Sequence, residues 1–153
     1  PELRRIRGGW LYQKADVHPN VREEVEGARL ATRPAPNDAE RRALRYAWIV
    51  AKHVRSSAIV FSVEDRVVAV GAGQMSRVDS VALCRMKAGE KLKGTVVASD
   101  AFFPFRDGVD LLTAAGATAI VQPGGSVRDD EVIKAADEQE GAMLLTGGRH
   151  FCP

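Results

Sequence analysis

The strongest constraint on the fold is a regular alternation of strand and helix patterns after residue 94. Short apolar runs typical of buried strands are separated by segments with helical periodicity. The expected order is strand 95–98, helix 107–115, strand 117–122, helix 126–140 and strand 142–146. Gly116 and Gly141 stand where the two helices should end, and Ser126 can cap the second one. Because a single helix joins each strand to the next, the strands must run parallel with right-handed crossovers, which predicts an α/β fold.

The central part of the chain carries signals for a helix, a hairpin and a second helix. Asn37 and Glu40 have the spacing of a capping box, and Ser76 with Asp79 offers a second N-cap. Between these helices, Glu64-Asp65 separates two β-branched runs, as in a β-hairpin. The expected elements are helix 37–54, strands 58–63 and 66–70, and helix 76–88.

The sequence divides into two parts of different character. Residues 1–36 indicate an irregular N-terminal arm or connector, and residues 37–153 indicate one domain. A chain of this length buries roughly two thirds of the surface that it exposes when unfolded, so its core needs no disulfide or structural metal. We expect a three-layer α/β/α architecture with a mostly parallel sheet and one hairpin.

Charge and cysteine content exclude several classes of protein. The 22 Lys+Arg against 20 Asp+Glu leave a net charge of +2, which predicts no nucleic-acid-binding or membrane-binding surface but is compatible with small anions. Cys84 and Cys152 are too few for a disulfide framework or a four-ligand zinc site, and they favour a cytoplasmic location. No apolar run approaches the roughly 18 to 20 residues of a membrane span, and the N-terminus lacks a signal-peptide core, so we expect no export.

Three loops should meet at one edge of the sheet, because ligands bind an open parallel sheet at the carboxyl ends of its strands. These loops cover residues 99–107, 122–126 and 146–151. They contain four of the five phenylalanines, a distribution that favours a flat ligand. The alternative for Phe103 and Phe105 is that they pack the loop against the sheet, which aromatic side chains do as often.

Two of the loops offer groups that bind anions. Gly124, Gly125 and Ser126 can present backbone amides at a helix start, although most such turns only reverse the chain. Arg149, beside two glycines, can grip a phosphate or carboxylate with two parallel hydrogen bonds. Its alternative role is that of a solvent-facing arginine near a terminus.

Other reactive side chains give weaker signals. Lys52-His53 could form an acid/base pair, but cations in the last turn of a helix more often interact with its dipole. His18 and His150 have no nearby partner with metal-ligand spacing, so no metal site is predicted. The glycines at 71 and 73 lack the third glycine of a dinucleotide motif, and they leave a turn before the helix that contains Arg77.

Five blocks of sequence together point to a known family. They are KHVRSSAIV from Lys52, GAGQMSRVDSV from Gly71, ASDAFFPFRDG from Ala98, IVQPGGSVRD from Ile120, and TGGRHF from Thr146. In this combination the chain closely resembles the C-terminal part of the bifunctional AICAR transformylase/IMP cyclohydrolase family of purine biosynthesis, in order and along essentially its whole length. The resemblance implies the second of two related cytidine-deaminase-like halves of the transformylase region, without the first half and the cyclohydrolase domain.

The resemblance also implies a reaction. Family members transfer a formyl group from 10-formyltetrahydrofolate, a co-substrate, to the 5-amino group of AICAR, and the cyclohydrolase closes the product FAICAR to IMP. The principal catalytic Lys-His pair of the family lies in the missing half, so the catalytic residues of this chain remain unknown and Lys52-His53 receives no catalytic role. Because the acceptor amine is a poor nucleophile, such catalysis depends on positioning and proton removal.

Residues of this chain inherit binding roles from the resemblance. Those implied beside the folate, the reacting centre or the AICAR phosphate are Arg77, Val78, Phe102, Phe105, Asp107, Gly108, Arg149 and Phe151. The loop argument adds Gly124, Gly125 and Ser126. Two positions depart from the family pattern: Ser57 stands where Asn is usual, and Cys152-Pro153 replaces a His-rich end.

Two hypotheses follow. The first is a fragment or split subunit of the formyltransferase that binds AICAR and folate together with the missing first half, as a cytoplasmic homodimer that is inactive as this chain alone. The alternative is a non-catalytic nucleotide-binding or assembly module derived from the same family. Since the sequence begins with Pro1, it fits N-terminal processing and a piece of a longer chain equally well.

Overall fold

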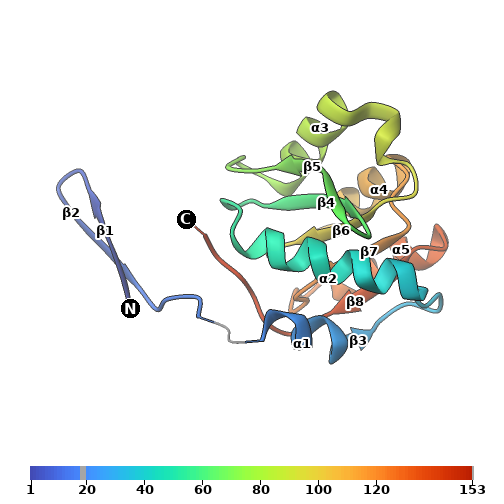
Figure 1. Cartoon of the computed structure of the whole chain (residues 1–153), viewed down its shortest axis with the longest axis horizontal. Coiled ribbons are helices and arrows are strands. Elements are labelled where there is room, and N and C mark those ends of the chain that lie inside the picture. The colour runs from blue at the N-terminus through green and yellow to red at the C-terminus, as the bar shows by residue number, and fades with distance from the viewer. Residues whose placement is uncertain (18–19, 153) are drawn as a thin grey trace.

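The computed structural model describes residues 1–17 and 20–152 (Figure 1). His18 and Pro153, two residues considered above, lie outside this part of the chain. The elements in chain order are β1 (Glu2–Ile6), β2 (Gly9–Gln13), α1 (Val21–Glu26), β3 (Arg29–Leu30), α2 (Asp38–Lys52), β4 (Ile59–Val63), β5 (Arg66–Gly71), α3 (Arg77–Ala88), a 3-10 turn η1 (Gly89–Leu92), β6 (Val96–Ser99), α4 (Arg106–Ala114), β7 (Ala119–Gln122), α5 (Asp129–Glu138) and β8 (Ala142–Leu145). None of the described helices has the length and apolarity that a membrane span requires.

The main sheet has six strands in the order β3-β8-β7-β6-β4-β5. As predicted, β6, β7 and β8 pair in parallel, and β4 with β5 forms the antiparallel hairpin. The expectation of a mostly parallel sheet was wrong, because β4 pairs antiparallel with β6 and β3 pairs antiparallel with β8. The β4–β5 hairpin joins the sheet by pairing β4 with β6, and β3 forms the opposite edge. The α/β fold therefore has a sheet of mixed parallel and antiparallel strands.

Helices cover both faces of this sheet and give three layers (Figure 1). On one face, Leu44 and Trp48 of α2 pack with Val60 of β4, and all three side chains are fully buried. On the other face, α3, α4 and α5 contribute buried side chains such as Leu112, which pack against Phe61 of β4. Since Val60 and Phe61 are consecutive and point to opposite faces, β4 is buried on both sides, as its β-branched and aromatic composition predicts.

The helix starts follow the capping signals, with one shift. Asn37 and Glu40 form the predicted capping box, with N···O distances of 2.9 and 2.8 Å, and Ser76 caps α3 through the Asp79 amide at 3.1 Å. The start of α5 was predicted at Ser126 but lies at Asp129. The Ser126 hydroxyl accepts from the backbone N–H of residue 128, which is the helix N-cap, so the serine stabilises the turn before the helix.

Residues 1–17 and 20–36 are more ordered than the sequence suggested. They form the β1–β2 hairpin, which stands away from the body, then α1 and β3 (Figure 1). Gly8 makes the hairpin turn with a φ of +85°, a conformation that favours glycine. The expectation of an irregular arm was wrong because Val25 of α1 is buried on α2, and the Thr32 hydroxyl accepts from the Met143 amide at 2.8 Å. The two-residue strand β3 is too short for its alternation to be recognised.

Candidate functional site

The three loops predicted to meet at the sheet edge are joined directly by hydrogen bonds. The Phe103 amide donates to the Gln122 side chain at 3.0 Å, which links the first loop to the end of β7. The Gly147 amide donates to the Pro123 carbonyl at 3.0 Å, and the His150 amide donates to the Asp100 carbonyl at 3.2 Å. Each loop therefore contacts the other two, which brings residues 19 to 50 positions apart into one region.

The phenylalanines divide between the two roles considered for them. Phe103 is 1% exposed and packs under its loop, which is the packing role. Phe102, Phe105 and Phe151 are 38%, 49% and 40% exposed, so their rings face solvent. Gly108 explains why the loop can close over Phe103, because a Cβ at position 108 would lie 2.5 Å from the Phe103 ring.

Asp100 is a buried polar hub that the sequence analysis did not single out. Its carboxylate accepts hydrogen bonds from Arg77 Nη2 at 2.9 Å, from the Ala58 amide at 3.2 Å and from the Ser56 hydroxyl. Its own side chain is 1% exposed. The one available signal was its place directly after a buried strand, where polar groups of parallel sheets gather. Asp100 thereby joins the first loop to the segment that precedes β4.

Arg77 is held inside this hub. Besides the ion pair with Asp100, its Nε donates to the Ser99 hydroxyl at 3.1 Å and to the Ala101 carbonyl at 3.2 Å. Its side chain is 18% exposed, and the next residue of α3, Val78, is half-buried. A ligand contact of Arg77, as the family resemblance implies, must therefore share a guanidinium that already has a carboxylate partner.

The glycine turn after β7 also has internal partners. The Asp129 carboxylate accepts from the Gly125 amide at 2.7 Å and from the Ser126 amide at 3.1 Å. Gly124 and Gly125 have φ values of +71° and +93°, which explains the pair of glycines. Because Asp129 occupies these amides, an external anion can use them only after that carboxylate moves.

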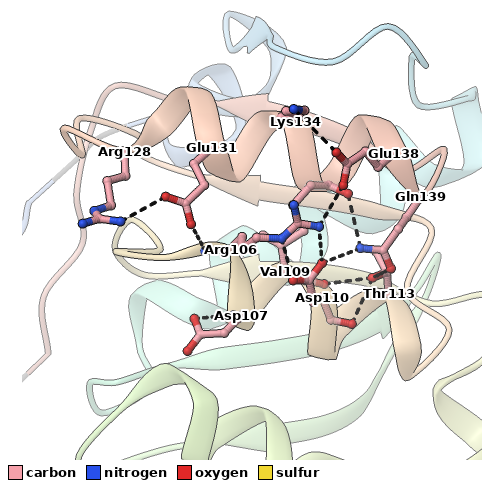
Figure 2. A network of polar contacts seen from close by, with 12 residues as sticks. Arg106, Asp107, Val109, Asp110, Thr113, Arg128, Glu131, Lys134, Glu138 and Gln139 are labelled. Atoms are coloured by element: carbon pink, nitrogen blue, oxygen red, sulfur yellow. Dashed lines mark hydrogen bonds and ion pairs between the residues drawn. The ribbon is translucent and has the colours of Figure 1, made fainter.

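The start of α4 is fixed to α5 by a network of charged groups (Figure 2). Arg106 donates to the carboxylates of Asp110 at 2.9 and 3.1 Å and of Glu138 at 2.8 Å. This contact lowers the pKa of Asp110. The Glu131 carboxylate accepts from the Arg106 amide at 3.4 Å and from the guanidinium of Arg128 at 3.2 Å, as Figure 2 also shows. Arg106, the first residue of α4, is therefore held to α5 through both its side chain and its backbone amide.

Two site residues depend directly on that network. The Arg128 guanidinium carbon lies 4.9 Å from the centre of the Phe105 ring, a cation–π contact. Asp107 follows Arg106, and its carboxylate accepts from the adjacent Gly108 amide at 2.7 Å. The second carboxylate oxygen of Asp107 points away from the network in Figure 2, and the residue is exposed. Phe105 and Asp107 are thus presented at the surface from a fixed helix start.

The C-terminal segment carries alternating exposed and buried side chains. Arg149 and Phe151 are exposed, and the Arg149 guanidinium carbon lies 5.0 Å from the Phe151 ring centre. They border a groove of about 380 Å³, whose other lining residues are Gln13, Lys14, Ala15, Asp16 and Val17. This groove was not foreseen, because the 13–17 segment was assigned to an irregular arm. Two cationic side chains, one aromatic ring and one carboxylate therefore surround it.

The remaining candidate residues are Lys52, His53, Ser57 and the two cysteines. Lys52 is the last residue of α2 and His53 its C-cap, where cations interact with the helix dipole. The Ser57 carbonyl accepts from the Ser80 hydroxyl at 2.7 Å. Burial raises the pKa of the Cys84 thiol to about 12, and Cys152 is half-buried. Within residues 1–17 and 20–152, no group of three or more His, Cys, Asp or Glu side chains is placed to hold a metal ion.

Comparison with known proteins gives consistent matches. The sequence model described as the AICARFT/IMPCHase bienzyme matches residues 1–87. The chain is 58% identical over 153 residues to the bifunctional purine biosynthesis protein PurH of Chloroflexus aurantiacus, a match that covers 98% of this chain and 29% of that protein. It is 54% identical over 150 residues to the PurH of an Anaeromyxobacter strain, covering 98% of this chain and 28% of that protein. The chain thus spans less than a third of the length of these curated relatives.

Proposed function

Because the chain belongs to the AICARFT/IMPCHase bienzyme family, we propose that it forms the second, cytidine-deaminase-like half of an AICAR transformylase that acts in purine biosynthesis. The observation that carries this proposal is the presentation of Arg149 and Phe151, in the last of the three joined loops, beside a groove whose other wall is the segment 13–17. A guanidinium and an aromatic face suit a phosphorylated, flat substrate such as AICAR. The exposed rings of Phe102 and Phe105 suit a second flat ligand, the 10-formyltetrahydrofolate co-substrate.

In this proposal the chain binds and orients rather than supplying the proton acceptor. Formyl transfer forms a bond between the AICAR amine nitrogen and the formyl carbon, and it breaks the bond from that carbon to the folate nitrogen. The amine loses one proton, and the leaving folate nitrogen gains one. Arg149 grips the phosphate, Phe151 flanks the nucleotide, and Phe102, Phe105, Asp107 and the Gly108 backbone border the reacting groups. The base belongs to the first half of the transformylase region.

Calorimetry with AICAR tests the binding part of the proposal. Wild-type chain should bind AICAR, and Arg149→Ala should weaken binding by about 10- to 100-fold, the worth of a charge-assisted hydrogen-bonded contact. Arg66→Ala is the matched control, because Arg66 is an exposed arginine on β5 that pairs only with its neighbour Asp65 among the ion pairs of the described residues. Binding that is absent in the wild type, or unchanged by Arg149→Ala, contradicts the proposal.

An activity assay tests the division of labour. The isolated chain should transfer no formyl group, and adding a polypeptide that carries the first transformylase half should restore transfer. We further propose that the active form is a homodimer in the cytoplasm. Sedimentation of the reconstituted protein checks the dimer, and cell fractionation checks the location. Full-rate transfer by the isolated chain contradicts the need for the first half.

A second candidate function is a non-catalytic nucleotide-binding or assembly module. The observation that favours it is Ser57, which stands where the family resemblance leads us to expect Asn and offers a shorter hydroxyl in place of an amide. For this candidate, AICAR binds but the first half restores no activity. Ser57→Asn then shows whether the missing amide alone explains the inactivity. If it does, the variant should transfer the formyl group in the presence of the first half; if more of the site is lost, it should not.

A further inference from the structure

His150 occupies an unusual place in the C-terminal segment. Its side chain is 1% exposed, although both sequence neighbours face solvent. Nδ1 lies 2.8 Å from an Asp16 carboxylate oxygen, and Nε2 lies 3.0 Å from a Glu24 carboxylate oxygen. The ring also packs on Trp48, with 4.8 Å between the ring centres. Buried polar groups require hydrogen-bond partners, and here each ring nitrogen has a carboxylate.

The two carboxylates belong to different elements and are themselves bound. Glu24 lies on α1, and its Oε2 also accepts from Trp48 Nε1 at 2.7 Å, which ties it to α2. Asp16 lies in the segment that lines the groove, and its Oδ2 also accepts from the Phe151 amide at 3.3 Å. The imidazole therefore connects the C-terminal segment to α1, to α2 and to the wall of the groove.

This arrangement has a direct consequence for the neighbours of His150. Arg149 and Phe151 are joined to it by single peptide bonds, and an anchored residue between them limits where both side chains can point. The Phe151 backbone is additionally held by Asp16, the same carboxylate that binds the imidazole. An orientation fixed before the ligand arrives lowers the entropy lost on binding.

We propose that His150 is a positioning residue, which acts through Asp16 and Glu24 to hold Arg149 and Phe151 toward the groove. The inference rests on the proposed function, because it takes the ligand of Arg149 to be a nucleotide phosphate. It assigns no contact between His150 and the ligand. The role of His150 is to keep the guanidinium at the distance that a two-point grip on a phosphate requires.

Calorimetry with AICAR and with its nucleoside, which lacks the phosphate, tests the inference on the full chain. His150→Phe preserves an aromatic ring beside Trp48 and removes both nitrogens. It should weaken AICAR binding about tenfold or more relative to nucleoside binding, since the lost orientation falls on the phosphate contact. Val132→Ala, a fully buried change in α5, is the control for general destabilisation and should leave that ratio unchanged. An unchanged ratio in His150→Phe overturns the inference.

Variants of Asp16 provide the decisive comparison, because Asp16 is 23% exposed and its replacement leaves the core intact. Asp16→Asn and Asp16→Ala remove the same negative charge from the groove, but only Asn retains an oxygen acceptor for the imidazole and the Phe151 amide. Asp16→Ala should therefore bind AICAR more weakly than Asp16→Asn does. If Asp16 acted only through its charge, the two variants would bind AICAR equally well. Equal affinity of the two variants, or tighter binding by Asp16→Ala, overturns the inference.

Amide hydrogen exchange separates failure of this inference from failure of the proposed function. In His150→Phe, the amides of residues 150 and 151, which donate to Asp100 and Asp16, should exchange about tenfold faster or more than in the wild type, since the segment loses its anchor. A wild-type chain that does not bind AICAR refutes the proposed function, and the exchange rates still decide whether His150 anchors the segment. Unchanged exchange in a folded His150→Phe variant refutes the anchoring itself.

Discussion

Replacement of Asp100 should reveal how much of the loop arrangement depends on one buried carboxylate. Asp100→Ala leaves the Arg77 guanidinium without its anion and the Ala58 amide without its acceptor. Breaking a buried ion pair on one side costs about 3–5 kcal/mol. Because Arg77 retains its contacts with Ser99 and Ala101 and some access to water, we expect the lower end, about 3 kcal/mol of unfolding free energy.

Asp100→Asn separates charge from hydrogen bonding at the same position. The amide oxygen can still accept from Arg77 and from the Ala58 amide, and the amide NH₂ can donate to the Ser56 hydroxyl. Only the charge assistance is lost, so the unfolding free energy should fall by about 1–2 kcal/mol. The two variants should therefore differ by roughly 1–2 kcal/mol, which is the contribution of the retained hydrogen bonds.

Urea unfolding measures both values, and thermal unfolding gives an independent check. A loss of about 3 kcal/mol corresponds to a Tm decrease of roughly 6–12 °C in a chain of this size. Asp65→Ala is the control, because Asp65 forms an exposed pair with Arg66 and should change stability by less than about 0.5 kcal/mol. If Asp100→Ala lowers the unfolding free energy by less than about 1 kcal/mol, the description of Asp100 as the hub of the loops is refuted.

Three further predictions concern local features. Gly108→Ala should cost about 1–3 kcal/mol in urea unfolding, because the new Cβ meets the buried Phe103 ring at 2.5 Å, whereas Gly148→Ala, which has open space around it, should cost little. Asn37→Ala should cost about 1 kcal/mol by the same assay, and Asn37→Asp should restore most of it, since a carboxylate oxygen can accept from the Glu40 amide. Equal stability of the two Asn37 variants contradicts the cap. Burial raises the pKa of Cys84 from 9.0 to about 12, so the thiol should react slowly with thiol reagents and Cys152 should react first. Because the folded state binds the Cys84 proton more tightly than the unfolded state, the protonated thiol contributes fully to the unfolding free energy below pH 9.0. This contribution is lost as the pH rises toward about 12. In Cys84→Ala the unfolding free energy should therefore fall less over this pH range.

The parts of the fold that follow local rules were predictable from the sequence. The capping box at Asn37 and the N-cap at Ser76 involve residues three positions apart, and the structure places both helix starts there. The parallel trio β6, β7 and β8 follows from the lengths of its connections. The antiparallel edges were not predictable in this way, because the pairings of β4 with β6 and of β3 with β8 are set by packing between segments far apart in the chain.

In the candidate site, too, features set by local sequence were predictable and features set by long-range contacts were not. The meeting of the three loops followed from the strand pattern, whereas contact of the exposed Phe102, Phe105 and Phe151 rings with a ligand stays a prediction. The partners that hold the loops were missed, because Asp16 and Asp100 become important only through contacts with residues 134 and 23 positions away, respectively. A lone acidic residue in a loop carries no sequence signal for such a role. The shift of the α5 start has the same cause, since Asp129 bonds back to the glycine turn.

The polar groups around the loops differ in what a ligand must displace. Arg77 and the amides of Gly125 and Ser126 are bound by Asp100 and Asp129, so an anion that uses them exchanges one hydrogen bond for another and gains little net free energy.

Arg149 is different. Within the described residues its guanidinium stacks on Phe151 and forms no ion pair with a carboxylate. An anion that binds there has no carboxylate of the described residues to displace and faces a donor array that is already oriented. The affinity of this chain for a phosphorylated ligand should therefore reside mainly in the C-terminal segment, which makes the anchor of that segment a determinant of binding as much as the arginine that it carries.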